Sequence, residues 1–475
     1  MNVTDINLPV AVLGAGPVGL AAAAHLVARG MTPLIFEASE NVAGNLATYR
    51  HVRLFSPWQY NVDKAALRLL VDAGWPMPAE DDLPAAGEII DQYLQPLAQL
   101  PAIAAHLKLG HRVVQVSRQG FDKVKTRGRE LAPFIVRAVT ASGEREYFVS
   151  AVIDATGTWS HPNPLGASGI DAIGEITHAA RIAYGMPDVL GAERHRYAGQ
   201  RVLVAGSGHS AAGTLIALAQ LAEEEPGTTL VWAVRGAAIE KAFGGGSADG
   251  LPARGALGTR LKALQASGKL EIHTRFRIHA LEVEGNALRV VGDEVDGNSP
   301  VIDGVDQIVA STGARPNLEL TRELRVRHDP WLESTDALAP LIDPNEHSCG
   351  TVRPHGHREL AHPEPGYYAV GAKSYGRATN FLMATGYEQV RSVVAALAGD
   401  LAQADDVQLE LPETGVCSTR LEYGVQLTPT SCCGGPAPAG SAACCVQDAD
   451  AKTQGKAGCG CSDPVPSLKA KSCCA

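Results

Sequence analysis

The feature that most constrains this chain is a glycine-rich turn that occurs twice, each time between an apolar run and a helical segment. The first copy, "LPVAVLGAGPVGLAAAAHLVARGMTPLIFE", predicts a strand over 8–13, a helix over 18–29 and a second strand from residue 34. The second copy, "QRVLVAGSGHSAAGTLIALAQLAEEEPGTTLVWAVRG", repeats this order. Each copy reads as a βαβ unit, so the sequence predicts an α/β fold built from two such units in series.

The first copy has the spacing of a dinucleotide-binding turn. Gly14, Gly16 and Gly19 form the pattern GxGxxG directly after a strand. The first glycine permits the tight turn, the second lets a pyrophosphate approach the backbone, and the third lets helix and strand pack closely. Glu37 follows the second strand, where its carboxylate can accept hydrogen bonds from a ribose diol. A glycine turn without a ligand is the alternative, and the complete βαβ context favours the dinucleotide.

The second copy carries a different residue at the end of its second strand. Gly206, Gly208 and Ala211 form the pattern GxGxxA, and Arg235 stands where an acid would select NADH. A guanidinium can pair with a 2′-phosphate that a carboxylate would repel. The sequence therefore predicts a preference for NADPH, with a solvated Arg235 of no specific role as the alternative.

The pattern of the rest of the chain divides it further. Residues 45–110 read as an insertion over the first unit, with a helix over 89–100, and the alternation in "HRVVQV", "FIVRAV" and "REYFVSAVID" predicts a small antiparallel sheet. "GYYAVGAKSYGRATNFLMATGYEQVRSVVAALAG" predicts a strand and a long helix that return to the first domain. We expect the first domain over 1–164 and 326–400, the second over 165–325, and a linker and tail over 401–475.

Composition excludes some classes of partner. The net charge of -10 and the lack of a basic cluster argue against a nucleic-acid partner. The N-terminus lacks the pattern of a signal peptide, and no apolar run approaches the roughly 18 residues of a membrane span. We therefore expect a soluble cytoplasmic protein without a membrane partner.

The last 45 residues differ from everything before them. They are rich in Gly, Ala, Pro and Ser, which predicts a disordered tail, and they hold most of the 10 cysteines. Thiolates are soft ligands, so closely spaced cysteines can chelate thiophilic species such as trivalent arsenic, trivalent antimony or Hg(II). General scavenging of heavy metals and a tail without a role are the alternatives. The candidate ligands are Cys432, Cys433, Cys444, Cys445, Cys459, Cys461, Cys473 and Cys474.

Cysteine is scarce in the body of the chain. Before residue 417 only Cys349 occurs, so the body has no CxxC pair that could exchange electrons with a flavin. Cys349 lies in the histidine-rich segment "HSCGTVRPHGHRELAH". It is either a receiving site for a thiophilic substrate or an incidental residue of a polar loop.

Further motifs carry a resemblance to a known superfamily. Two turns in this order, "DATG" at 154–157, "STGARP" at 311–316 and "GYYAVGAKSYGR" resemble the flavoproteins with two dinucleotide-binding domains, which include disulfide reductases and class B flavin monooxygenases. The resemblance implies two Rossmann-like domains, with FAD in the first and NADPH in the second. The implied FAD residues are Gly14, Gly16, Pro17, Gly19, Glu37, Ala38, Gly44, Asn45, Arg53, Ser56, Ala155, Thr156, Gly157 and Gly371. The implied NADPH residues are Gly206, Ser207, Gly208, His209, Ser210, Arg235 and Gly313.

The missing CxxC pair favours the monooxygenase branch. Its signature FxGxxxHxxx(F/W) is matched in "AIGEITHAARI" by Gly174 and His178, while Ala172 and Ile182 replace the aromatics. Ser56 and Pro57 lie near the position of that branch's active-site Asn. With its tail, the chain looks like the flavin monooxygenases of arsenic-resistance operons.

That resemblance implies a reaction. NADPH reduces FAD, O2 adds to give a C4a-hydroperoxyflavin, and one oxygen atom passes to a small trivalent arsenical such as methylarsenite or arsenite. We expect no catalytic residue beyond the flavin, because the cofactor performs the difficult step. Two rivals stay open: a monooxygenase of organic sulfur or nitrogen, and a thiol-based heavy-metal-binding protein on a flavoprotein scaffold.

Overall fold

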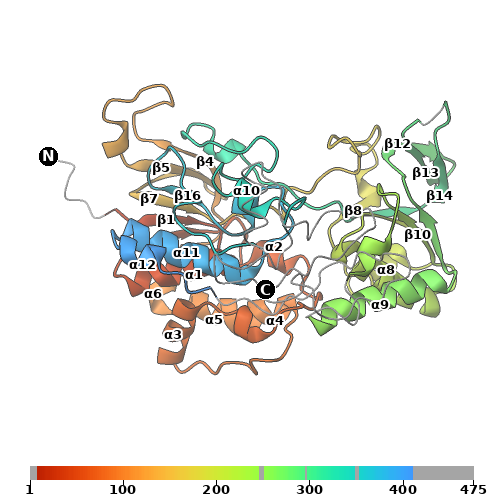
Figure 1. The fold of residues 1–475 in the computed structure, drawn as a ribbon, viewed down its shortest axis with the longest axis horizontal. Coiled ribbons are helices and arrows are strands. Elements are labelled where there is room, and N and C mark those ends of the chain that lie inside the picture. Colours follow the sequence, from red (N-terminus) through yellow and green to blue (C-terminus); the bar gives the residue numbers. More distant parts are fainter. Residues whose placement is uncertain (1–7, 245–250, 295–296, 348–351, 410–475) are drawn as a thin grey trace, which may run out of the picture.

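The computed structural model describes residues 8–244, 251–294, 297–347 and 352–409. Two five-stranded sheets, in which all strand pairs are parallel, form the centres of two lobes (Figure 1). The first sheet has the order β16 (Tyr367–Ala369), β7 (Ala151–Asp154), β1 (Val10–Leu13), β2 (Pro33–Phe36) and β3 (Leu107–Lys108). The second has the order β11 (Leu270–His273), β10 (Thr229–Ala233), β9 (Arg201–Ala205), β15 (Gln307–Ala310) and β8 (Ile182–Tyr184).

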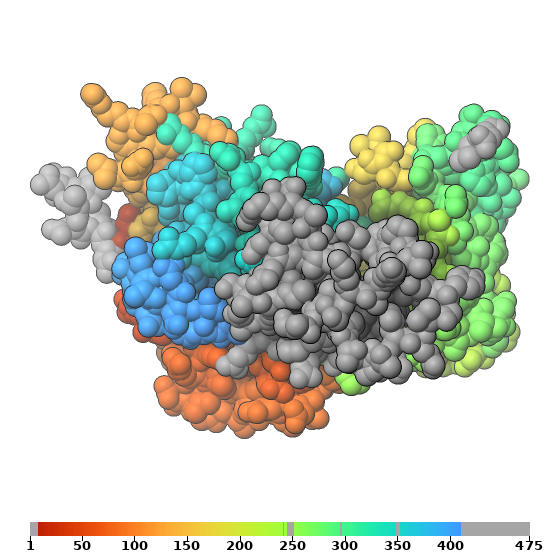
Figure 2. All heavy atoms as spheres, viewed as in Figure 1, coloured from red at the N-terminus to blue at the C-terminus, as the bar shows by residue number. Residues whose placement is uncertain are grey.

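Helices cover both sheets. The first lobe contains α1 (Pro17–Ala28), α2 (Gly44–Ala47), α3 (Lys64–Asp72), α4 (Ala86–Ile89), α5 (Gln95–Gln99), α6 (Pro101–Ala104), α10 (Ala339–Ile342), α11 (Met383–Leu397) and α12 (Leu401–Asp405). The second contains α7 (Arg194–Tyr197), α8 (His209–Glu224) and α9 (Pro252–Ala266). Short 3₁₀ turns are η2 (Trp58–Tyr60), η4 (Arg129–Leu131), η5 (Ala179–Arg181), η6 (Glu240–Phe243), η8 (Glu319–Thr321) and η9 (Gly371–Tyr375). In the space-filling view, the surface of the late helices (blue) adjoins the orange surface of the first lobe (Figure 2), and Tyr387 of α11 donates its hydroxyl to Asn61 O at 2.8 Å.

The first predicted βαβ unit is confirmed as β1, α1 and β2. β1 is buried along its whole length, as expected of a central parallel strand with helices on both faces. Ala21–Ala24 of α1 are fully buried, and their small side chains let the helix lie close to the sheet and to α11. The Asp63 side chain caps α3 by accepting hydrogen bonds from Ala65 N and Ala66 N at 2.9 Å.

The predicted helix over 89–100 exists, but its interior is irregular. Between α4 and α5 the chain forms a π-helical turn, η3 (Ile90–Leu94). Pro96 has no N–H, so the carbonyl of Gln92 lacks its usual helical donor. Trp75 Nε1 donates to Gln92 O at 2.8 Å and satisfies it. The missing N–H of Pro96 and the hydrogen bond from Trp75 to the Gln92 carbonyl thus account for the irregular turn.

The predicted antiparallel sheet is present with a different last strand. It consists of β4 (Arg112–Arg118), β5 (Phe134–Thr140) and β6 (Gly143–Val149). The segment "REYFVSAVID" is not one strand: it divides at Ser150, whose N–H donates to Pro9 O at 2.9 Å, and continues as β7 of the parallel sheet. In the second lobe, β12 (Ile278–Glu284), β13 (Ala287–Gly292) and β14 (Val301–Val305) form a further antiparallel sheet.

Two neighbouring chain segments connect the lobes. Asn163 N donates to Gly313 O at 2.9 Å, Asn163 Nδ2 donates to Thr312 O at 3.1 Å, and Thr312 Oγ1 donates back to Asn163 O at 2.5 Å. The outgoing and returning crossings are therefore hydrogen-bonded to each other. Among the described helices, none is both long and apolar enough to cross a membrane.

Candidate functional site

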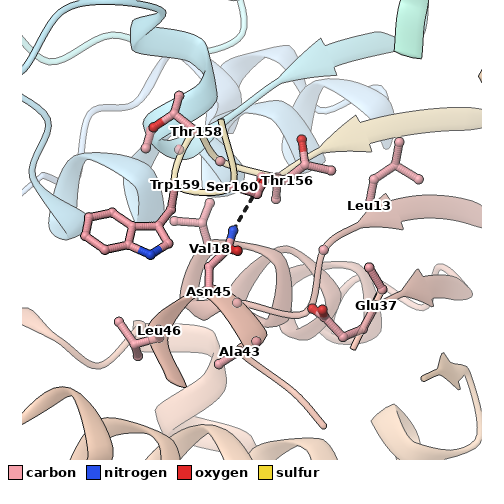
Figure 3. A pocket seen from close by; sticks show the side chains of 18 of the residues that line it. Leu13, Val18, Glu37, Ala43, Asn45, Leu46, Thr156, Thr158, Trp159 and Ser160 are labelled. Carbon is pink, nitrogen blue, oxygen red and sulfur yellow. Dashed lines mark hydrogen bonds between the residues drawn. The ribbon is translucent and has the colours of Figure 1, made fainter. Parts of the chain in front are cut away.

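A cavity of about 540 Å³ lies at the carboxyl ends of β1 and β7, beside the N-termini of α1 and α11 (Figure 3). Ligands of parallel α/β sheets bind at this edge. Eleven sequence-predicted residues line it: Gly14, Gly16, Pro17, Glu37, Ala38, Gly44, Asn45, Ala155, Thr156, Gly157 and Gly371. Gly19, Arg53 and Ser56 are not among its lining residues.

Each glycine of the first turn meets a different structural requirement. Gly14 has φ +97°, and a Cβ there would lie 2.8 Å from Ala155 O. A Cβ on Gly19 would lie 1.9 Å from Gly14 O, so Gly19 is required for the turn although it does not line the cavity. A Cβ on Gly16 would meet no atom within 4 Å. The open space at Gly16 is the cradle that a pyrophosphate would occupy.

Glu37 braces the turns around the cavity. Its Oε2 accepts from Ala15 N at 2.9 Å and its Oε1 from Ser39 N at 3.0 Å. The side chain is only 8% exposed. A carboxylate oxygen can accept more than one hydrogen bond, so Glu37 can brace the backbone and still accept from a ribose hydroxyl.

Two helices present their N-termini to the cavity without a capping side chain. Gly16 precedes α1 and Leu382 precedes α11, and neither position makes a side-chain cap hydrogen bond. The cavity is lined by Pro17 of α1 and Met383 of α11. Backbone N–H groups and the helix dipole make such ends suitable for phosphates and for negative charge on a bound ring.

A buried ion pair, which the sequence did not reveal, supports the cavity floor. Lys373 Nζ donates to Asp154 Oδ2 at 2.6 Å and to Thr156 Oγ1 at 3.1 Å. Lys373 is 3% exposed and Asp154 is fully buried. Tyr367 donates its hydroxyl to Asp154 Oδ2 at 3.1 Å. The pair joins the end of β7 to the turn at Gly371, both of which border the cavity.

A second buried network holds the Gly371 turn. Gly371 N donates to Gln389 Oε1 at 2.7 Å, and Gln389 Nε2 lies 2.9 Å from both His355 Nε2 and Ser374 Oγ. His355 Nδ1 lies 2.8 Å from Arg353 O, which can only accept, so Nδ1 carries the proton. The ring must then be neutral for Nε2 to accept from Gln389. Burial accordingly holds the pKa of His355 below its usual value.

This network predicts an acid-sensitive contribution to stability. Because the native pKa of His355 lies below the unfolded value of about 6.5, the contribution is complete above that pH and decreases as the pH falls below it. The unfolding free energy of the unmodified protein should decrease between pH 7 and pH 5. We expect a smaller decrease for His355→Asn, because its amide can donate and accept hydrogen bonds without titrating. Urea unfolding at both pH values measures it. Identical decreases in the two proteins would contradict the assignment.

Aromatic residues border the cavity on the side that contacts the second lobe. Trp159 lines it, donates from Nε1 to Thr48 Oγ1 at 2.7 Å, and lies 4.6 Å from Tyr49 between ring centroids. A Cβ on Gly185, just after β8 of the second lobe, would lie 2.7 Å from the Trp159 ring. The indole is thus packed between the two lobes beside the cavity. His161 also lines it, and partial burial followed by the charges of Lys373 and Arg315 lowers its pKa.

The second glycine turn has the same geometry. Gly206 has φ +131°, and a Cβ there would lie 2.3 Å from Ser311 O. Gly208 precedes α8 without a side-chain cap, and Ser207, Gly208 and His209 are exposed. The His209 ring lies 5.4 Å from that of Phe55 in the first lobe. Of the remaining predicted NADPH residues, Ser210 is half-buried in the first turn of α8, Arg235 is exposed after β10, and Gly313 lies in the returning crossing.

Cys349 and all eight tail cysteines lie outside the described residues. Within the described ranges, no group of three or more His, Cys, Asp and Glu side chains is arranged to hold a metal ion.

Comparison with known proteins identifies relatives. Residues 11–349 match the pyridine nucleotide-disulphide oxidoreductase family. Indole-3-pyruvate monooxygenase YUCCA6 of Arabidopsis thaliana is 28% identical over 204 residues, which are 42% of this chain and 42% of YUCCA6. The aligned part thus spans about two fifths of that curated relative.

Solved structures share the fold. Bacillithiol disulfide reductase Bdr from Bacillus cereus has a TM-score of 0.61 at 18% identity, covering 82% of this chain and 99% of its own. The FAD-bound cadaverine monooxygenase DfoA from Erwinia amylovora has a TM-score of 0.59 at 13% identity, covering 89% and 99%. The family match extends over more than half of the chain. The chain therefore belongs to the pyridine nucleotide-disulphide oxidoreductase family.

Proposed function

We propose that the chain is an FAD-dependent, NADPH-consuming monooxygenase that oxidises a trivalent arsenical, such as methylarsenite or arsenite, to its pentavalent form. The observation that carries the proposal is the cavity at the first dinucleotide turn, with no cysteine among its described lining residues, in a chain whose last 45 residues hold closely spaced cysteines. A disulfide reductase needs a thiol pair beside its flavin. Oxygen transfer to a soft acceptor needs none.

The cavity fits FAD. The cradle at Gly16 and the uncapped N-terminus of α1 suit the pyrophosphate, Glu37 suits the ribose, and the N-terminus of α11 suits the ring that becomes negative on reduction. Reduced FAD supplies the activation of O2. The protein's own residues bind and orient the cofactor, and the contacting rings of Trp159 and Tyr49, which line the cavity, limit access of water to it.

The second turn fits NADPH. The exposed Gly208 and the uncapped N-terminus of α8 suit its pyrophosphate. Arg235 is exposed beyond β10, where it can pair with a 2′-phosphate, and its one described hydrogen bond is a long contact of 3.5 Å to Ala167 O.

Arg235→Glu tests this assignment. We expect kcat/KM for NADPH to fall about 100-fold, since the substitution removes a charge-assisted pair and adds a repulsive carboxylate, while kcat/KM for NADH changes little. Steady-state NAD(P)H oxidation measures both. Arg260→Glu, an exposed change of equal charge on α9, is the matched control. Equal losses of kcat/KM for NADPH and NADH would show that Arg235 does not bind the 2′-phosphate.

The tail supports the choice of substrate. Trivalent arsenic has a lone pair that can accept an electrophilic oxygen atom, and it binds thiolates strongly. Cys432 and Cys433, Cys444 and Cys445, and Cys473 and Cys474 are three vicinal pairs that can each form two As–S bonds. A tail of this composition has no comparable use in oxidation of an organic amine.

Arsenical-stimulated NADPH oxidation is the decisive experiment. We expect the purified yellow protein to oxidise NADPH faster when methylarsenite or arsenite is added, with pentavalent product formed in proportion to NADPH consumed. A pentavalent arsenical is the control and should give no stimulation. If only amines or sulfides stimulated NADPH oxidation, the substrate would be an organic nitrogen or sulfur compound instead of an arsenical. A protein that cannot be reconstituted with FAD would overturn the whole proposal.

A further inference from the structure

The side chain of Gln389 connects a buried histidine to the wall of the cavity. Gln389 lies on α11 and is fully buried. Its amide contacts the backbone N of Gly371, His355 Nε2 and Ser374 Oγ. Gly371 lines the cavity, and a Cβ on it would lie 3.3 Å from the side chain of Val18, which lines the cavity too. A displacement of the Gly371 turn therefore changes the shape of the cavity.

Chemistry fixes the direction of each hydrogen bond around Gln389. A backbone N–H can only donate, so Oε1 of the amide faces Gly371 N, and Nε2, which can only donate, faces His355. A proton on His355 Nε2 would set two donors against each other. If the amide rotated to exchange Oε1 and Nε2, it would satisfy the histidine but turn its donor toward Gly371 N. In either orientation, protonation of His355 removes one hydrogen bond from the series that ends at Gly371.

The groups around His355 act on its proton in opposite directions. Burial lowers the pKa of the ring, and a backbone hydrogen bond and the carboxylates of Glu359 and Glu388 oppose that effect. Glu388 is itself paired with Arg391, whose guanidinium donates to both carboxylate oxygens at 2.9 and 2.7 Å. The ring of Tyr375 packs against the imidazole at 5.6 Å between centroids. A turn that loosens and admits water to the imidazole would therefore favour its protonation.

We propose that Gln389 is a positioning residue that couples FAD binding to the protonation of His355: the neutral ring holds the Gly371 turn in the form that binds FAD, and the protonated ring releases it. This rests on the proposed function, in which the cavity holds FAD. By reciprocity, bound FAD favours the neutral ring to the same extent. FAD affinity is therefore highest above the pKa that His355 has in the FAD-free protein, and it decreases as the pH falls below that value.

Release of FAD from the loaded full-length protein tests the coupling. The fluorescence of free FAD after dilution gives Kd, and we expect Kd to rise about fivefold from pH 7 to pH 5, within the limit of one linked proton. In His355→Gln, Oε1 can accept from Gln389 without titrating, so Kd should rise less than about twofold. His195→Gln, an exposed change on α7, is the matched control and should keep the full rise. Circular dichroism at each pH shows that the protein stays folded. Equal rises in the unmodified protein and His355→Gln would overturn the proposal.

Gln389→Leu tests whether the glutamine transmits the effect. Leucine cannot accept from Gly371 N, so Kd for FAD should already be about fivefold higher at pH 7 and should then change little with pH. Adding His355→Gln should leave this flat profile unchanged, because the two side chains act in one series. Gln99→Leu, an exposed change on α5, is the matched control. A glutamine with a merely structural role would raise Kd equally at every pH, and that result would overturn the proposal.

Proton uptake separates this proposal from the function on which it rests. Release of FAD in weakly buffered solution between pH 5 and pH 6 should take up protons, which an indicator dye detects, and His355→Gln should take up fewer. Neither NADPH nor an arsenical takes part in the measurement. Equal proton uptake in the two proteins would refute the coupling while leaving the monooxygenase standing. A protein that retains no FAD at any pH would remove the cofactor and, with it, both proposals.

Discussion

Lys373→Met is expected to lower the free energy of unfolding by about 3–5 kcal/mol and to weaken FAD retention. The substitution leaves the carboxylate of Asp154 fully buried, with the Tyr367 hydroxyl and Thr156 as its remaining partners. Thr156, which lines the cavity, also loses a hydrogen bond from Lys373 Nζ. Chemical denaturation gives the change in stability, and flavin absorbance after gel filtration gives the retained FAD.

The double variant Asp154→Asn with Lys373→Met provides the control. It removes both charges, so we expect it to recover more than half of the lost unfolding free energy, because most of the penalty is one uncompensated buried charge. If the ion pair acts by holding the cavity floor, FAD retention should recover together with the unfolding free energy. Additive losses in the double variant would show that the two side chains act independently.

Glu364→Ala is expected to lower the free energy of unfolding by a similar amount, about 3–5 kcal/mol. Glu364 is 2% exposed and accepts from Arg118 Nε and Arg129 Nη2, both at 2.8 Å, and from Arg325 N at 2.9 Å. Burial lowers the pKa of Arg118, and the hydrogen bond that Arg118 donates to Glu364 opposes that effect. Without the carboxylate, two buried guanidinium groups lose their shared anion.

The exposed pair of Arg137 and Glu146 is the matched comparison. Its partners lie 2.5 Å apart on β5 and β6, and both side chains are 42% exposed. Glu146→Ala should change the free energy of unfolding much less than Glu364→Ala, because solvent screens the pair. Urea unfolding of both variants compares them directly. A loss for Glu364→Ala as small as that for Glu146→Ala would mean that the cluster does not stabilise the fold.

The glycine turns could be predicted because their signals are local. An apolar run, the spacing of Gly14, Gly16 and Gly19, and an alanine-rich helix follow one another within 30 residues, and each is explained by sterics of the turn itself. The boundary at Ser150 could not be predicted. β6 and β7 are both apolar enough for strands, and only pairing with β1 and β16 assigns the second of them to the parallel sheet.

The buried polar residues could not be found from the sequence for the same reason. A lysine such as Lys373 ordinarily extends into solvent, and its partner Asp154 is 219 positions away. Gln389 likewise acquires its role only when α11 is placed beside the Gly371 turn. The single available signal was Lys373's place within "GYYAVGAKSYGR", the segment that the resemblance assigned to FAD.

The order of strands in the first sheet also bears on how the protein is synthesised. β16, which pairs with β7, and α11, which packs on α1, follow the whole second lobe in sequence, whereas the strands of the second parallel sheet lie within residues 182–310. On the ribosome, the nascent second lobe can complete its sheet while the first still has an unpaired edge at β7. The cavity, which is lined by Gly371 and Met383, therefore forms last, and the unpaired edge of β7 can pair with other chains until β16 covers it.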